Sequence, residues 1–258
     1  MSVPTTSQTV VACGGYRFYC RNREEFERIC EDVFGSHEYR FETRRRAPYI
    51  IDAGAHVGVA TAYFKQHHPR ARILALEANP VTFALLQENV SHNGFDDVHP
   101  MHAALAPEAG EITFYVAASD DEPGAWGDSA VQQPWHEGED TMVVTAPAVT
   151  LSSLLTEPVD LVKLDIEGLE TAVLQEAAPR LSLARRVILE FHGTDRNPGN
   201  DIETVLEVLR GAGLTPEIRQ WGEVVQPDDI QRDEPYWLSI RAERLNPWQR
   251  VRRVTGFG

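Results

Sequence analysis

The most informative change in the pattern of apolar and polar positions falls between residues 49 and 66. Residues 49–53 form a short apolar run, which is too brief for a helix and is typical of a buried strand. From Val57 to Gln66 the apolar positions recur at helical spacing. Gly54 and Gly58 lie in the turn between them, where the lack of a Cβ lets the backbone bend sharply and pass close to a ligand. Strand, turn and helix in this order open a doubly wound α/β fold.

Comparable runs continue along the chain. Alternating or β-branched runs predict strands, and apolar residues three or four positions apart predict helices. Proline in the first turn and Asn93-Gly94 at the end delimit one of these helices. The predicted strands are 10–20, 72–77, 98–104, 112–117, 142–146, 161–166, 186–191, 214–220 and 236–242, and the further predicted helices are 23–33, 80–93 and 201–211.

Length and composition are those of a globular protein. With 258 residues, of which 42% are hydrophobic and 24% charged, the chain can bury a large core, so we expect one α/β domain with modest additions. Its apolar runs fall short of the roughly 20 residues that cross a bilayer. Its first residues lack the basic start and apolar core of a signal peptide. These features predict a cytoplasmic protein without a membrane partner.

Charge and cysteine content narrow the partners further. A formal net charge of −15 would repel phosphates over the whole surface, so we expect no nucleic-acid substrate and favour a small or neutral acceptor. The three cysteines, Cys13, Cys20 and Cys30, have no metal-ligand spacing, which favours reduced thiols in the cytoplasm.

The turn after the first core strand has the wrong residue for a dinucleotide. His56 occupies the position of the middle glycine in the G-x-G-x-x-G fingerprint, so the turn lacks the usual binding site for a pyrophosphate. Asp52, at the end of the strand, would repel a phosphate and attract a cationic or hydroxyl-bearing ligand. Glu77 ends the next strand at a spacing that suits hydrogen bonds to ribose hydroxyls. Together these residues resemble the S-adenosylmethionine site of class I methyltransferases.

A second group of charges interrupts the predicted strand at 161–166. Lys163 and Asp165 share one face of this strand, and Glu167 continues the same side just beyond it. Charges in a core strand are costly unless they are paired. Either Lys163 forms a structural pair with a carboxylate, or the carboxylates are held at the strand end for chemistry. We favour the structural pair for Lys163 and a functional role for the two acids, since ligands bind at this edge of the sheet.

The next predicted strand ends with Glu190 and His192. Neighbouring strands would bring these residues together with Asp165 and Glu167 in one polar cluster. A lone histidine is more often a satisfied structural residue, but imidazole near its ordinary pKa can accept the proton of an alcohol. Both interpretations of His192 remain open.

These motifs resemble the FkbM-type methyltransferases over roughly residues 39–192. The matching stretches are IDAGAHVG at 51–58, EANP at 77–80, Asn89, KLDIEGLE at 163–170 and ILEFH at 188–192. The resemblance implies transfer of a methyl group from S-adenosyl-L-methionine, typically to oxygen, in natural-product or glycan tailoring. It also implies a Rossmann-like class I fold, with a seven-stranded, mostly parallel sheet in the order 3-2-1-4-5-7-6 and an antiparallel last strand.

We expect two sets of site residues. The cofactor would be bound by Asp52, Gly54, Ala55, His56, Gly58, Glu77, Ala78, Asn79 and Ala103, the last beside the adenine ring. The catalytic cleft would be lined by Asp165, Glu167, Glu190 and His192.

The chain then divides into three parts. Residues 1–48 would form an N-terminal cap or an oligomer contact, residues 49–243 the methyltransferase domain, and residues 244–258 a basic tail. Within the domain, residues 119–140 are predicted to form a long loop on the substrate side, whose acids either attract a cationic acceptor or are simply solvated. A homo-oligomer remains possible.

Methyl transfer by direct displacement needs alignment, exclusion of water and a base. His192 or one of the clustered carboxylates could be that base. Mg²⁺ held by Asp165, Glu167 and Glu190 could instead acidify the acceptor hydroxyl, but no spacing signature demands it, so we assign no metal ligand. Two other functions compete with this one: a nicotinamide-dependent oxidoreductase and a non-catalytic module that binds the cofactor.

Overall fold

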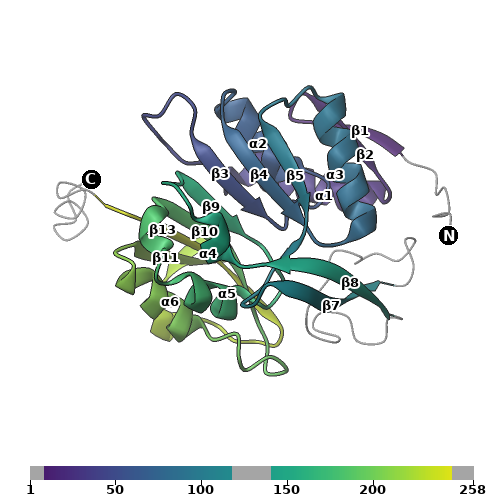
Figure 1. Ribbon diagram of the computed structural model, residues 1–258. Coiled ribbons are helices and arrows are strands. Elements are labelled where there is room, and N and C mark those ends of the chain that lie inside the picture. Colours follow the sequence, from purple (N-terminus) through teal and green to yellow (C-terminus); the bar gives the residue numbers. More distant parts are fainter. Residues whose placement is uncertain (1–8, 118–140, 246–258) are drawn as a thin grey trace.

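The computed structural model describes residues 9–117 and 141–245 (Figure 1). The predicted loop at 119–140 and almost all of the predicted basic tail lie outside the described residues. Within the described part, helices flank a large, mostly parallel sheet, as a Rossmann-like class I methyltransferase fold requires.

The central sheet has eight strands in the order β12-β11-β13-β10-β9-β3-β4-β5. Strands β5, β4, β3, β9 and β10 run parallel to one another, and β13 runs antiparallel between β10 and β11. The predicted order and the antiparallel last strand are therefore confirmed, and the short β12 adds an eighth strand to the seven predicted. From one edge to the other, the strands are Glu223–Val225 (β12), Thr215–Gln220 (β11), Tyr236–Glu243 (β13), Arg186–Gly193 (β10), Leu161–Leu164 (β9), Tyr49–Ala53 (β3), Arg72–Glu77 (β4) and Val98–His102 (β5).

Helices cover both faces of the sheet, and each face has its own apolar core. Ile50 of β3 packs with α2 and α3 on one face, whereas the next residue, Ile51, packs with α5 and α6 on the other. This alternation follows from the two-residue period of a strand. The helices are Val59–His67 (α2), Pro80–His92 (α3), Leu151–Leu154 (α4), Glu170–Ala177 (α5) and Ile202–Gly211 (α6), with short 3₁₀ turns at Leu181–Leu183 (η2) and Pro227–Asp229 (η3).

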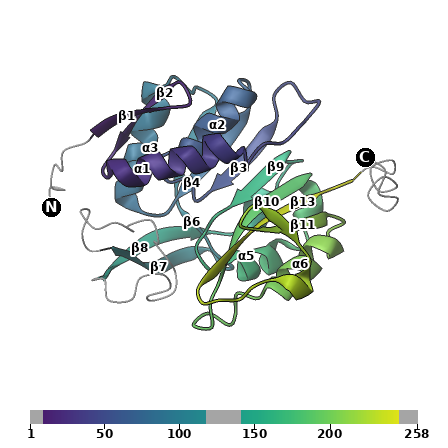
Figure 2. The same cartoon turned by 180° about the vertical axis from the view of Figure 1, so that it is seen from behind.

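The N-terminal residues add a hairpin and a helix. Strands β1 (Thr9–Cys13) and β2 (Tyr16–Cys20) pair antiparallel, and α1 (Arg23–Cys30) continues into a π-helix, η1 (Glu31–Gly35). The single strand predicted for 10–20 is wrong, because Gly14-Gly15 reverses the chain between β1 and β2. Figures 1 and 2 show this segment on the same side of the molecule as α2 and α3.

One asparagine holds this hairpin against the core. The side-chain amide of Asn89, on α3, accepts from the Tyr19 backbone N–H at 2.7 Å and donates to the Tyr19 carbonyl at 3.1 Å. The same amide donates to the Val57 carbonyl in the glycine turn at 2.9 Å. A single side chain thus joins the hairpin, α3 and the turn that follows β3.

A second, three-stranded sheet stands beside the main one. It consists of β6 (Ala104–Leu105), β8 (Thr141–Val149) and β7 (Gly110–Ala117), in that order. The two added strands predicted from β-branched residues are thus β7 and β8. The strand predicted at 98–104 is divided between β5 and β6, which belong to different sheets.

Two of the cysteines are joined. Cys13 at the end of β1 forms a disulfide with Cys30 at the end of α1, and Cys20 is free and buried. The expectation of reduced thiols is therefore wrong for Cys13 and Cys30. Metal-ligand spacing was a poor guide here, because the β-hairpin folds back and brings residues 17 positions apart into contact.

Thiol titration of the unfolded, unreduced chain is expected to find one reactive cysteine, Cys20. After reduction the count should rise to three. The free energy of unfolding should then fall by about 3 kcal/mol, because the cross-link no longer restricts the unfolded chain. Ellman's reagent and urea denaturation measure both quantities, and three thiols before reduction would contradict the disulfide.

Among the described helices, none combines the length and the apolar composition needed to cross a membrane.

Candidate active site

A cavity of about 720 Å³ opens where the parallel strands end. Its walls come from the turn after β3, the ends of β4, β9 and β10, and the segment around η1 in the N-terminal part. Nine of the thirteen predicted site residues line it: Gly54, Ala55, His56, Glu77, Ala78, Ala103, Asp165, Glu167 and Glu190. The other four, Asp52, Gly58, Asn79 and His192, are not part of the cavity lining.

Gly54 is the point at which the two predicted halves of the site meet. Its φ is +72°, and an added Cβ would lie 1.8 Å from the backbone oxygen of Asp165. The Asp165 N–H donates to the Ala53 carbonyl at 3.2 Å, so the ends of β3 and β9 are in direct contact. Only glycine allows this approach, because any side chain would collide with the neighbouring backbone.

Glu77 is fixed at the cavity wall by backbone donors. Its carboxylate accepts from the His56 N–H at 2.9 Å and from the Asn79 N–H at 2.8 Å. Asn79 itself caps α3, because its side-chain oxygen accepts from the Val81 N–H at 2.9 Å. Asn79 thus positions both Glu77 and the helix, and its predicted contact with the cofactor stays a prediction.

Asp52 also lies behind the wall rather than in it. It is fully buried within β3, accepts from the Thr61 hydroxyl at 2.6 Å and lies 3.4 Å from the Lys163 ammonium. The Lys163 ammonium is also 3.4 Å from Asp165 and donates to the Gly54 carbonyl at 2.8 Å. The predicted ion pair of Lys163 is thus present. The charge of Asp52 anchors Lys163 under the glycine turn, and its predicted role in cofactor binding stays a prediction.

Electrostatics keep Lys163 charged. Burial opposes the ammonium, but the carboxylates of Asp165 and Asp52 outweigh burial and raise the pKa of Lys163 above its ordinary value. The partly buried His56 shows the opposite behaviour. Loss of solvent lowers the pKa of its imidazole to about 4, so this side chain is neutral at physiological pH.

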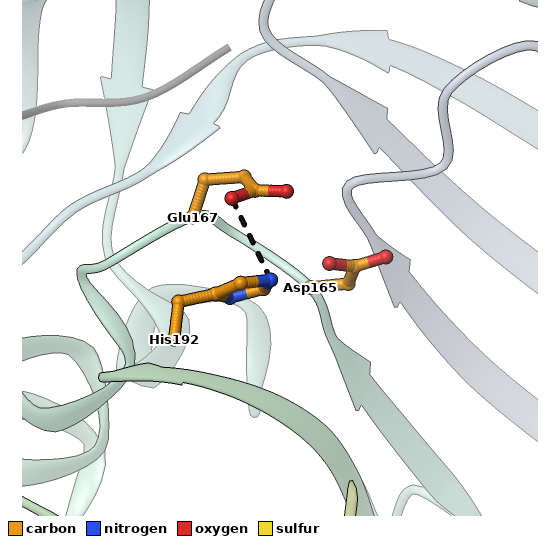
Figure 3. A group of neighbouring side chains, drawn as sticks. All are labelled: Asp165, Glu167 and His192. Carbon is orange, nitrogen blue, oxygen red and sulfur yellow. Dashed lines mark ion pairs between the residues drawn. The ribbon is translucent and has the colours of Figure 1, made fainter. Parts of the chain in front are cut away.

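The remaining acids gather around His192, as Figure 3 shows for Asp165, Glu167 and His192. The His192 Nε2 atom lies 3.5 Å from Glu167 and 3.7 Å from Glu190. On the other side of the ring, Nδ1 lies 3.2 Å from Glu170, a fully buried carboxylate at the start of α5. The predicted clustering of Glu167, Glu190 and His192, from the ends of β9 and β10, is therefore confirmed.

Three members of the cluster, Glu167, Glu190 and His192, have raised pKa values. Burial raises the pKa of Glu167 to about 8, partly offset by His192, and burial and Asp165 raise the pKa of Glu190 to about 7. For His192, burial disfavours the imidazolium, but Glu167 and Glu170 outweigh it and raise its pKa well above the usual value.

Backbone strain accompanies the cluster. Glu167 has a φ of +54°, a left-handed conformation that is uncommon for a residue with a side chain. It lies three residues after the end of β9 and turns its carboxylate towards His192. Strained residues of this kind concentrate at functional sites, where surrounding contacts hold them in place.

Sequence reasoning missed several residues of the site. Glu170 falls within the KLDIEGLE stretch, but an acid at a helix start is ordinary and gave no signal of its contact with His192. Asn200, which donates to Glu170 at 2.5 Å and to the His192 carbonyl at 2.9 Å, carried no signal at all.

The residues of the outer cavity wall were also not predicted from the sequence. Trp221 and Trp237 line it although 65% and 53% of their surfaces are exposed, respectively. Arg219 and Arg241 lie beside them in the lining; Arg219 is paired with Glu217 at 2.9 Å, and Arg241 donates to the Arg40 carbonyl. Exposed tryptophans and guanidinium groups together suit a ligand with both apolar and anionic surface.

Comparison with known sequences places these features in context. The profile of a family described as the methyltransferase FkbM domain matches residues 52–221. The hexuronic acid methyltransferase AglP of Haloferax volcanii is 27% identical over 241 residues, which cover 91% of this chain and 90% of that protein. The 31-O-demethyl-FK506 methyltransferase FkbM of Streptomyces tacrolimicus is 29% identical over 202 residues, covering 66% and 74%, respectively.

Solved structures show a similar fold. The SAM-dependent methyltransferase from Agrobacterium tumefaciens superposes with a TM-score of 0.52 at 12% identity, over 95% of this chain and 72% of that one. At this identity the likeness concerns the architecture alone.

Proposed function

Because the chain belongs to the FkbM methyltransferase family, we propose that it transfers the methyl group of S-adenosyl-L-methionine to a hydroxyl oxygen of a small natural product or a sugar. The observation that carries this proposal is a single cavity with a glycine turn and a fixed carboxylate at one end and an acid cluster at the other. The first end suits the cofactor, and the second suits an acceptor that must lose a proton.

The residues at the first end fit the cofactor. The carboxylate of Glu77 is held at the cavity wall, where it can accept hydrogen bonds from ribose hydroxyls. Ala55, Ala78 and Ala103 carry small side chains that leave room for the cofactor beside the turn at Gly54. When bound, S-adenosyl-L-methionine supplies a methyl group already activated by a positively charged sulfur.

Glu190 is the proton acceptor that the geometry favours. It lines the cavity and its side chain is 33% exposed, whereas His192 lies behind the lining. Glu190 would accept the hydroxyl proton as the acceptor oxygen takes the methyl group that S-adenosyl-L-methionine would supply, with S-adenosyl-L-homocysteine as the product. The surrounding residues align the two reactants and exclude water.

The outer wall supports a sugar-like acceptor. Indole rings pack well against the C–H faces of a ring such as a pyranose, and Trp221 and Trp237 present such faces at the cavity. Arg219 and Arg241 would favour an acidic group on that ring. The name of one relative mentions a hexuronic acid, and the name of the other mentions an O-demethyl compound, which supports methylation of an oxygen atom.

Calorimetric titration of S-adenosyl-L-methionine and S-adenosyl-L-homocysteine tests the cofactor site. We expect micromolar binding to the wild type, and at least about tenfold weaker binding to Glu77→Ala, because hydrogen bonds to a charged group are lost. Glu207→Ala provides the control, since Glu207 is exposed on α6, outside the cavity. A wild-type chain that binds neither compound would overturn the proposal, and NADH would be titrated next.

A further inference from the structure

Three side chains of the acid cluster converge as metal ligands do. Asp165, Glu167 and His192 each offer one donor atom, and these atoms all lie within 4.8 Å of one another (Figure 3). They come from two separate segments, the loop after β9 and the strand β10. The resulting set contains one imidazole nitrogen and two carboxylate oxygens.

The imidazole is oriented from outside this set. The Nδ1 atom of His192 contacts Glu170, leaving Nε2 directed at Glu167. Glu170 is fully buried and is itself fixed, because it accepts from the Gly168 N–H at 3.0 Å and from Asn200 at 2.5 Å. Metal-binding histidines are commonly held this way, with one ring nitrogen on a carboxylate and the other on the ion.

The charges around these ligands favour a cation. Besides Asp165 and Glu167, the site includes Glu190 and Glu170, whereas Lys163 is shared with Asp52 on its other side. Acids packed this closely repel one another in a medium from which water is largely removed. A divalent ion would relieve that repulsion. The free energy of binding the ion would also offset the conformational cost of the left-handed backbone at Glu167.

We propose that Asp165, Glu167 and His192 bind one divalent cation, with Glu170 as the positioning residue for His192. A mixed nitrogen and oxygen set suits Mn²⁺, and the two carboxylates suit Mg²⁺. The ion would leave positions open towards the cavity for the acceptor hydroxyl and lower the pKa of that hydroxyl, while Glu190 takes the proton. The role of the ion in catalysis rests on the proposed function, but its binding does not.

The competing interpretation is a self-contained ion pair. A charged His192 between Glu167 and Glu170 would satisfy these three groups without any ion. The two interpretations differ in one measurable respect. A cation site binds Mn²⁺ in a folded chain that lacks substrate, and a closed ion-pair network does not.

Mn²⁺ binding is therefore measured by calorimetry and by loss of the free-ion electron paramagnetic resonance signal, on the full chain stripped with a chelator. We expect one ion per chain in the wild type. Glu167→Gln and His192→Gln should each weaken binding at least tenfold, and Glu170→Gln by about tenfold to a hundredfold. Glu203→Gln is the control, because Glu203 pairs with Arg232 away from the cavity and should leave binding unchanged.

Two results would overturn the proposal. One is the absence of Mn²⁺ binding to a wild-type chain whose circular dichroism shows it to be folded. The other is Mn²⁺ binding that neither Glu167→Gln nor His192→Gln weakens, which would place the ion elsewhere; if one variant fails to fold, the other decides. Titrating S-adenosyl-L-methionine in the presence of chelator separates the proposals, since cofactor binding without Mn²⁺ binding removes only the metal site.

Discussion

Replacing Lys163 with methionine is expected to lower the free energy of unfolding by about 3–5 kcal/mol, the usual cost of removing one partner of a buried ion pair. Lys163 is 2% exposed and Asp52 is fully buried, so the variant would leave a carboxylate without its cation in the centre of the sheet. The Gly54 carbonyl would also lose a hydrogen bond from the ammonium. Urea denaturation followed by circular dichroism measures the change.

Lys65→Met is the matched control. Lys65 is also buried, with 7% exposure, but its carboxylate partner Asp97 is 57% exposed and can remain hydrated. We expect a loss of about 1 kcal/mol there, mainly from the hydrogen bond to the Ala71 carbonyl. Adding Asp52→Asn to Lys163→Met should recover part of the stability. If Lys163→Met and Lys65→Met lower the free energy of unfolding equally, burial of the Lys163–Asp52 pair makes no additional contribution to stability.

Gly54→Ala should abolish cofactor binding and destabilise the fold. The new methyl group would lie 1.8 Å from the Asp165 backbone oxygen, so β3 and β9 would have to separate. The positive φ adds a further cost for any residue with a Cβ. We expect at least a hundredfold loss of S-adenosyl-L-methionine affinity, corresponding to about 3 kcal/mol, and a lower melting temperature. Calorimetry and thermal denaturation measure these effects.

Gly94→Ala separates the collision from the backbone strain. Gly94 follows α3 with a φ of +67°, close to that of Gly54, but no atom lies within 4 Å of an added Cβ. The control should therefore cost about 1 kcal/mol from conformation alone and leave cofactor affinity unchanged. If Gly54→Ala behaves like Gly94→Ala, the close approach of β3 and β9 is not what the site requires.

The sequence was most informative where a pattern has one structural solution. The apolar runs, the glycine turn and Pro80 predicted the central strands and α3 within a few residues, because period and capping are local properties. The meeting of Asp165, Glu167, Glu190 and His192 was also predictable, since adjacent parallel strands end at one edge.

The features that were not predicted depend on the orientation of side chains and on contacts between distant segments. A strand residue faces one side or the other, and the sequence did not reveal that the Asp52 carboxylate is buried and bonded to Thr61. The Cys13–Cys30 disulfide required knowledge of the hairpin, and Glu170 contacts Asn200, a residue 30 positions later that lies just before α6. Trp221, in the turn between β11 and β12, and Trp237, on β13, reach the cavity from the end of the sheet whose strand order only the full topology reveals.

The hydrogen bonds of the Asn89 side chain limit the order in which parts of this protein can fold during synthesis. The hairpin is made first on the ribosome, yet the side chain that bonds to its backbone lies 70 residues later in the chain. Until α3 has emerged, Phe18 and Phe26, both almost fully buried in the finished molecule, lack much of their packing surface. The N-terminal segment that lines the cavity can therefore pack fully only after the core has been synthesised. A chain interrupted before residue 89 would expose apolar surface at its N-terminus, which chaperones would have to cover.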